Sequence, residues 1–204
     1  MDRLENNMAI VSGTIVSGFK YSHDVFGEGF YTFEIVARRT SGKLDVIPVI
    51  VSERLINANA DFKGKYVIIN GQFRSFNSDG RLLLNLFVRN IAFTDPAEID
   101  TNDLLLTGYI CKKPIYRKTP KGRLIADVLF AVNRPYGKSD YIPCIFWGRN
   151  ALFADTLEVG TKLNLWGRIQ SREYQKAAEN GGMTEFRTVY EVSVNRISLA
   201  EEDA

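Results

Sequence analysis

The chain has 204 residues, of which 45% are hydrophobic and 25% are charged, and its formal net charge is +2 at pH 7. This mixture excludes an intrinsically disordered chain, and the length fits either one large domain or two small ones. The N-terminal sequence MDRLENNMAIV is charged and has no apolar run typical of a signal peptide, and no segment is long and apolar enough to cross a membrane. We therefore expect a cytoplasmic protein without a membrane partner.

An internal repeat divides the chain into two units. Its aligned segments are VSGTI (11–15) with LTGYI (106–110), GKLDVIPVIVSER (42–54) with GKSDYIPCIFWGR (137–149), KGKYVIINGQFRS (63–75) with VGTKLNLWGRIQS (159–171), and LNLFVRNI (84–91) with YEVSVNRI (190–197). The offset is 95, then 96, and finally 106 residues, which predicts one longer loop near the end of the second unit. Proline and acidic residues in TDPAEIDTN (94–102) interrupt the pattern, so we predict domains at 1–98 and 101–204.

Each unit is predicted to consist mainly of short strands. The strands, of which YTFEIVARR and DVIPVIV are examples, are rich in Val, Ile and aromatics and are bounded by turn residues. One helix is predicted between the third and fourth strands of each unit, in ERLINANADF and in GRNALFADTLEVG. The fold class that follows is all-β, with two tandem OB-fold five-stranded barrels that each carry one short helix between strands 3 and 4. Four glycines inside strand patterns predict bulges or tight bends: Gly13, Gly71, Gly108 and Gly167.

The third strand of the second unit is predicted to present an aromatic face to a ligand. Side chains alternate across a strand, so Tyr141, Pro143, Ile145 and Trp147 share one face while Ile142, Cys144 and Phe146 share the core face. Every nucleobase has a flat surface, so exposed aromatic rings can stack on any base without reading its sequence. The opposite interpretation, in which Trp147 only packs beneath a loop, stays open.

Residues 102–198 resemble the bacterial single-stranded DNA-binding protein family. The matching segments, in order, are NDLLLTGYICKKPIYRKTPKG, DVLFAVNR, DYIPCIFWGRNALFADTLEVGTKLNLWGRIQSREY and YEVSVNRI. The resemblance implies a non-enzymatic protein that binds single-stranded DNA during replication, recombination or repair. It also implies a homodimer with four OB barrels, because the family works with four barrels. The aromatic positions that the family uses for base stacking correspond here to Tyr136, Tyr141, Trp147 and Tyr174.

Basic side chains accompany these aromatic positions. Residues 101–204 hold 15 basic and 12 acidic side chains, whereas residues 1–100 hold 11 and 12. Phosphate contacts by lysine and arginine release counterions, so binding should weaken as salt rises. The predicted phosphate contacts are Lys113, Arg117, Arg134, Lys138, Arg149 and Arg172.

The first unit lacks the aromatic platform. It has Ser41, Val46, Ser52 and Ser78 at the positions of Tyr136, Tyr141, Trp147 and Tyr174. We expect this unit to supply structure. The aromatic-rich segment GFKYSHDVFGEGFY (18–31) is expected to form an apolar contact between the units, with a separate binding surface as the alternative.

Few residues suit catalysis or metal binding. His23 is the only histidine, and we find no nucleophile paired with a base, so we expect no enzyme, no metal and no cofactor. Cys111 and Cys144 lack metal-ligand spacing and are predicted to be buried free thiols.

Two functions besides single-stranded DNA binding stay open. One is a structural or adaptor OB-fold protein of a replication or mobile-element complex with weak nucleic-acid affinity, and the other is an enzyme or oligosaccharide binder on the same barrel. The sequence SLAEEDA has neither the flexible linker nor the Phe-terminated tip of the family, so recruitment of other proteins through an acidic C-terminal tip is not expected.

Overall fold

Strands make up most of the molecule. The structure, a computed structural model, describes residues 6–78, 80–176 and 185–201, while the side chains of residues 174–176 and 185–187 lie outside the described part. The first unit contains β1 (Asn7–Ile15), β2 (Lys20–Val25), β3 (Glu28–Arg38), β4 (Leu44–Ser52), β5 (Tyr66–Ser78) and β6 (Arg81–Phe93). The second unit contains β7 (Asn102–Ile110), β8 (Ile115–Lys118), β9 (Leu124–Arg134), η1 (Pro135–Gly137), β10 (Lys138–Trp147), α1 (Arg149–Asp155), β11 (Lys162–Lys176) and β12 (Glu185–Leu199).

Each unit closes into a five-stranded ring. In the first, β1 pairs with β3, β3 with β4, β4 with β6, β6 with β5, and β5 returns to β1. Only the β4–β6 pairing is parallel, as is its counterpart between β10 and β12. The second unit repeats this order with β7, β9, β10, β12 and β11. We call these rings the upstream barrel and the downstream barrel, and the predicted all-β class with OB-fold barrels is confirmed.

Two details of the prediction need correction. The short strands β2 and β8 extend the sheet beyond each five-stranded ring by pairing with β3 and β9. The helix predicted in the downstream barrel forms as α1, but its upstream counterpart in residues 53–65 consists of turns. There the side chains of Asn57 and Asp61 each accept a hydrogen bond from the backbone two residues on, at 3.1 Å and 2.9 Å. These local bonds compete with helical hydrogen bonds, so the segment stays irregular.

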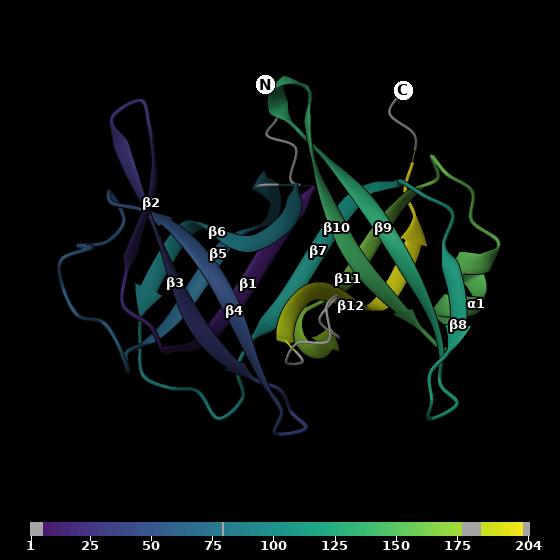
Figure 1. Cartoon of the computed structure of the whole chain (residues 1–204), viewed down its shortest axis with the longest axis horizontal. Helices are drawn as coiled ribbons and strands as arrows, with labels where there is room; N and C mark the ends of the chain where they lie inside the picture. The colour runs from purple at the N-terminus through teal and green to yellow at the C-terminus, as the bar shows by residue number, and fades with distance from the viewer. Residues whose placement is uncertain (1–5, 79, 177–184, 202–204) are drawn as a thin grey trace.

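The two barrels share one continuous sheet (Figure 1). Strand β1 runs antiparallel to β7, with Asn7 opposite Leu106 and Val11 opposite Asn102. The repeat offset makes these pairs equivalent under exchange of the barrels, so Ala9 and Leu104 sit at the centre of an internal pseudo-twofold axis. Each barrel therefore contributes the same edge to the junction, as the two subunits of a symmetric dimer do.

The four strand glycines lie where the barrels bend, as predicted. The register shifts between Asn70 and Gly71 and, equivalently, between Trp166 and Gly167. At Gly13 and Gly108 a side chain would collide with the backbone carbonyls of Val36 and Ala131, on the strand that closes each ring. These closing contacts require the absence of a Cβ.

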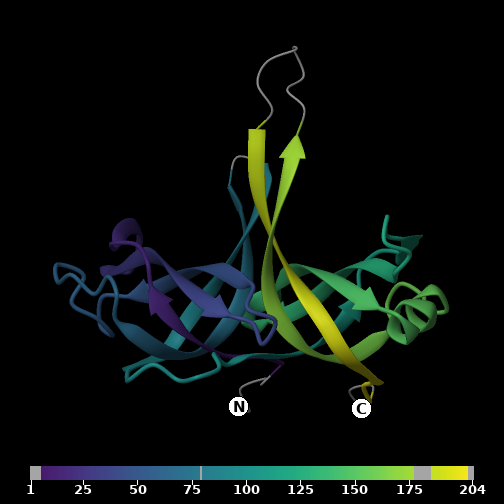
Figure 2. The same ribbon diagram turned by 90° about the horizontal axis from the view of Figure 1, so that it is seen from below.

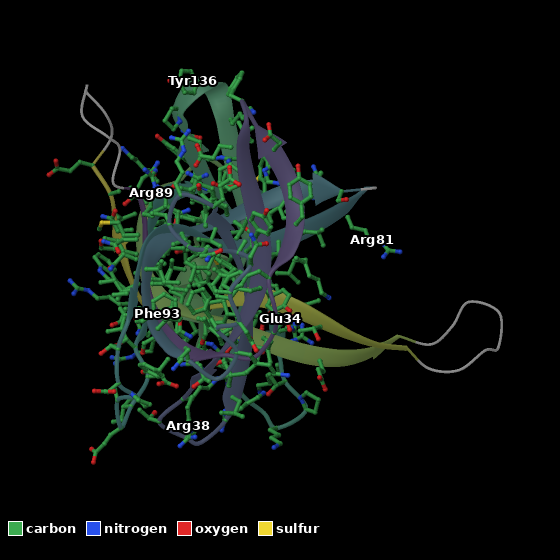
Figure 3. The ribbon with its side chains drawn as sticks, turned by 90° about the vertical axis from the view of Figure 1, so that its left-hand side faces the viewer. Glu34, Arg38, Arg81, Arg89, Phe93 and Tyr136 are labelled. Atoms are coloured by element: carbon green, nitrogen blue, oxygen red, sulfur yellow. The ribbon has the colours of Figure 1, made fainter. Side chains whose placement is uncertain are left out.

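Two long hairpins project from the middle of the molecule. The β5–β6 and β11–β12 hairpins rise side by side on one side of the paired barrels (Figure 2). Arg81, near the end of the β5–β6 hairpin, points away from the barrels (Figure 3).

The aromatic-rich segment at 18–31 does not join the barrels, so that expectation is wrong. Phe19 packs against Phe33 of its own barrel at 4.8 Å between ring centroids, while Phe26 is fully exposed at the turn between β2 and β3. This hairpin lies at the end of the molecule away from the downstream barrel (Figure 1). Among the described residues no helix is both long and apolar enough to cross a lipid bilayer.

Candidate nucleic-acid interface

A groove opens beside Trp147, with a volume of about 500 Å³. We call it the Trp147 groove. Its lining includes five cationic side chains and, among the described residues, no acidic one. The cationic side chains are Arg39, Lys43, Arg123, Arg168 and Arg172. An excess of positive charge around a hollow favours a polyanionic ligand such as a nucleic-acid backbone.

Trp147 is held in a fixed orientation at the end of β10. Its indole N–H donates a hydrogen bond to the hydroxyl of Ser193 on β12, at 3.0 Å. The ring is half-buried and lines the groove, so part of its surface reaches solvent. An aromatic ring whose edge is hydrogen-bonded and which also borders an open groove is suited to base stacking. The indole therefore contacts β12 through its N–H and also borders the groove.

Two of the five cations come from the other barrel. Arg39 and Lys43 flank the turn between β3 and β4, which reaches across to the downstream barrel. Arg39 makes two 2.5 Å bonds to the fully buried Asp45, whose carboxylate also accepts a hydrogen bond from the Ser171 backbone N–H at 2.9 Å. A buried carboxylate of the upstream barrel thus fixes the hairpin against β11 of the downstream barrel.

Sequence reasoning missed Arg39 and Lys43 as candidate ligand contacts. The repeat aligns them with Arg134 and Lys138, which were selected because they lie near aromatic residues of their own unit. The repeat alignment could have identified Arg39 and Lys43 as candidates. It does not reveal that each hairpin crosses to the opposite barrel, because that crossing is a feature of the tertiary structure.

Arg168 and Arg172, which also line the groove, differ in the protein groups that already neutralise or bind them. Arg168 has a buried Nε without a hydrogen-bond partner, and burial together with the charge of Arg39 lowers its pKa. Arg172 is about half exposed and lies 3.6 Å from Glu191. Arg168 Nη2 donates to Gln170 Oε1 at 3.5 Å, so a phosphate in the groove would add a charged acceptor to an arginine that has only this weak one among the described residues.

Tyr136 belongs to a different groove from Trp147. It lies at the tip of the β9–β10 hairpin, which crosses to the upstream barrel and bounds a cavity of about 300 Å³. Arg134 and Lys138 line this same cavity, so the structure separates three predicted site residues from Trp147. We call this cavity the upstream groove. Figure 3 shows Tyr136 at the tip of its hairpin and Arg89 below it on the upstream barrel.

The hairpin that carries Tyr136 is anchored in the same way as its counterpart. Asp140, fully buried, accepts a hydrogen bond from the Ser75 backbone N–H at 2.7 Å and lies 3.3 Å from Arg134. The backbone N–H of Tyr141 in turn donates to Ser75 Oγ at 2.8 Å. Burial raises the pKa of Asp140 although the hydrogen bond from Ser75 and the nearby Arg134 oppose that rise.

The other predicted site residues are scattered. Tyr141 is 43% exposed on the outer face of β10, whereas Ile145 on that face is buried, contrary to the prediction. Ile142, Cys144 and Phe146 are buried, as predicted. Lys113 and Arg149 are exposed, Arg117 is paired with Asp127 at 2.5 Å, and the side chain of Tyr174 lies outside the described part of the structure.

In the upstream barrel, the position equivalent to Trp147 lies beside two glutamates. Ser52 replaces the tryptophan, is buried, and donates a hydrogen bond to Glu28. The neighbouring Glu53 accepts the backbone N–H of Gly29 at 3.0 Å. Glu28 is paired with Arg54 at 3.3 Å, so the site carries no excess of positive charge, and a serine takes the place of the indole. The upstream barrel therefore has no equivalent of the Trp147 platform there.

Comparisons with known proteins find sequence relatives of the downstream barrel. Residues 101–200 match the family described as "Single-strand binding protein family". The downstream barrel belongs to this family. Single-stranded DNA-binding protein A of Bacillus subtilis is 35% identical over 81 residues, which is 36% of this chain and 47% of the relative. The single-stranded DNA-binding protein of Oceanobacillus iheyensis is 33% identical over 81 residues, 36% of this chain and 50% of the relative. This chain spans about half the length of the curated relatives it matches.

The likeness of the fold extends over both barrels. The crystal structure of wild-type single-stranded DNA binding protein from Thermus aquaticus aligns with a TM-score of 0.75 over 97% of this chain and 94% of that one, at 17% identity. A deletion mutant of the same protein aligns with a TM-score of 0.73 at 19% identity, over 97% and 96% of the two chains. At this identity the comparison establishes the shared architecture. The single-strand binding protein family match itself covers only the downstream barrel.

Proposed function

We propose that this protein binds single-stranded DNA without strong sequence preference, as a non-catalytic component of DNA replication, recombination or repair. The observation that carries the proposal is the Trp147 groove, in which one oriented indole is surrounded by five cations and no described acidic side chain. A base stacked on the indole contributes about 1–3 kcal/mol, and phosphate contacts add a salt-dependent part. The names of the family relatives support the same ligand.

The division of labour between the barrels is part of the proposal. Strand β6 ends at Phe93 and β7 begins at Asn102, so we place the domains at 1–98 and 101–204. The downstream domain holds Trp147 and most of the cations that line its groove, while the upstream domain contributes the hairpin with Arg39 and Lys43. Both domains are therefore needed for the complete groove.

We also infer a homodimer with four barrels. The outer face of the shared sheet exposes Met8, and the half-buried Leu105 and Trp166 lie opposite it in register on β7 and β11. An apolar row along a sheet face is suited to burial against a second copy. Both cysteines are free, which fits the proposed cytoplasmic location.

Trp147 fluorescence tests the proposed function. Trp166→Phe leaves Trp147 as the sole tryptophan, since the chain has two. Titrating this variant with oligo-dT should quench the emission strongly, and raising the salt should reverse the quenching. Titration with duplex DNA of the same length is the control and should quench far less. Unquenched Trp147 at saturating oligo-dT, in a folded protein, would refute the proposal.

A further inference from the structure

The upstream groove is a composite of both barrels and is rich in positive charge. Four of its lining side chains are cationic: Arg74 and Arg89 from β5 and β6, and Arg134 and Lys138 from the β9–β10 hairpin. Among the described residues the one acidic side chain that lines it is Asp140, which is already engaged by Arg134 and by the backbone of Ser75. The groove thus holds more cations than its own carboxylate balances.

Arg74 forms a flat platform inside this groove. Its guanidinium lies over the ring of Phe87 at 3.8 Å from the centroid. The edge of the guanidinium is fixed by Gln72, whose Oε1 accepts hydrogen bonds from Arg74 Nε and Nη2 at 3.0 Å and 2.5 Å. Arg74 is half-buried and lines the groove, and a planar cation held this way is suited to stacking on a base and to binding phosphate with its remaining donors.

The electrostatics of the groove favour an anion. Burial, with the nearby charges of Arg134 and Arg89, lowers the pKa of Arg74 to about 10. At neutral pH the side chain still carries its charge, so the repulsion among the three arginines persists in the free protein. A phosphate among them would relieve it.

Tyr136, at the tip of its hairpin, lines the upstream groove, and its exposure shows that it does not pack into the core. Its ring is 99% exposed, and its backbone has φ of 66°, a conformation that costs a bulky residue energy. The corresponding upstream hairpin places Ser41 at this position, followed by Gly42 with φ of 81°. Neither core packing nor the conformation of the turn requires an aromatic residue at this position. An exposed aromatic ring there is therefore suited to contact a ligand.

We propose that the upstream barrel has its own single-stranded DNA groove, in which Arg74 on Phe87 replaces the missing tryptophan and the downstream hairpin supplies Tyr136 and Lys138. The inference rests on the proposed function for the class of its ligand. The two grooves have equivalent hairpin cations, Arg39 and Lys43 in one and Arg134 and Lys138 in the other, but Ser52, the counterpart of Trp147, does not line the upstream groove. The stacking groups therefore differ in kind and in position: an indole in one groove, and a guanidinium with a tyrosine in the other.

Stoichiometry with short oligonucleotides tests this inference. In the Trp166→Phe background, a labelled oligo-dT of about eight nucleotides, a length that one OB barrel can cover, is titrated by anisotropy while Trp147 emission is followed. The test variant carries Tyr136→Asn and Arg89→Gln; asparagine tolerates the positive φ, so the hairpin should fold. The matched control carries Phe26→Asn and Arg54→Gln, because Phe26 is also an exposed aromatic at a hairpin tip with positive φ, 52°.

The expected result is two oligonucleotides per chain for the parent and the control. The test variant should bind the second oligonucleotide roughly five- to 150-fold more weakly from the lost stack alone, while quenching of Trp147 keeps its midpoint. One oligonucleotide per parent chain with full Trp147 quenching would overturn the second groove and leave the proposed function standing. Two tightly bound oligonucleotides in the test variant would overturn it as well. Absence of quenching and of anisotropy change in the parent would overturn both proposals.

Discussion

The carboxylate of Asp45, in the upstream barrel, bonds the backbone N–H of Ser171, in the downstream barrel, at 2.9 Å. The repeat reproduces this relationship in the opposite direction, between Asp140 and Ser75 at 2.7 Å. Each barrel therefore uses a buried aspartate to hold its own basic hairpin on its neighbour. These bonds couple the geometry of both grooves to the junction between the barrels.

Replacing Asp45 should weaken the whole molecule. Asp45→Ala leaves the largely buried Arg39 without its partner and the Ser171 N–H without an acceptor, and loss of one member of a buried ion pair costs about 3–5 kcal/mol. Urea unfolding followed by circular dichroism measures the loss. Asp95→Ala, at an exposed position, should change the free energy of unfolding by no more than about 0.5 kcal/mol. Equal stabilities of the two variants would contradict the anchoring role.

Removing the indole should weaken DNA binding without unfolding the protein. Trp147→Ala removes one base stack and should lower the affinity for oligo-dT by about 1–3 kcal/mol. Ser193→Ala keeps the ring but releases its edge, so a smaller loss is expected. Anisotropy titrations at fixed salt give both affinities, and the order of the two losses is the decisive outcome.

Lys43 should contribute to the salt dependence although it belongs to the upstream barrel. Lys43→Ala removes one phosphate contact, so the slope of log K against log salt should fall in magnitude by about 0.7. Lys63→Ala removes the same charge from an exposed loop outside the described grooves and should leave the slope unchanged. Identical slopes for Lys43→Ala and the parent would remove the upstream hairpin from the interface.

Gly108 should tolerate no side chain. Gly108→Ala drives a Cβ into the Ala131 carbonyl, which belongs to the backbone of the ring-closing strand and is not free to turn aside. We expect a loss of roughly 1–3 kcal/mol or more, the usual cost of overpacking. Gly18→Ala, where no atom lies within 4 Å of the added Cβ, is the matched control. Thermal unfolding of the two variants should therefore diverge clearly.

The two thiols should differ in reactivity. Burial raises the pKa of Cys144, and only the thiolate reacts, so alkylation of Cys144 in the native protein should be much slower than that of the partly exposed Cys111. A folded pKa above the unfolded one stabilises the fold below the ordinary thiol pKa, and that contribution is lost as the pH rises above it. Mass spectrometry after timed alkylation checks the order, with urea-unfolded protein expected to show similar rates at both sites.

The barrel architecture was predictable because it depends on local patterns. Alternation identified Ile142, Cys144 and Phe146 as core, and the repeat indicated that the chain consists of two similar units. The helix predicted in residues 53–62 does not form, because Asn57 and Asp61 make local turn hydrogen bonds, a competition that apolar spacing does not reveal.

The candidate site was predictable only within one barrel. Trp147 was selected on its strand position, and the structure places it on a cationic groove. The assignment of Tyr136 to the same platform overlooked that hairpins cross between barrels, a consequence of the β1–β7 junction. Asp45 and Asp140 occupy equivalent positions in the repeat, but their role as buried anchors depends on the opposite barrel and is visible only in the fold.

The junction between β1 and β7 has a further consequence, because both strands belong to one polypeptide. Two separate one-barrel chains joined in this way would dissociate on dilution. Here the covalent link keeps the two barrels at a high effective concentration at any protein concentration. Identical subunits must also share every substitution, but fused halves are free to diverge. The equivalent positions Trp147 and Ser52 illustrate such divergence, because two fused barrels can acquire different surfaces while they keep the same fold.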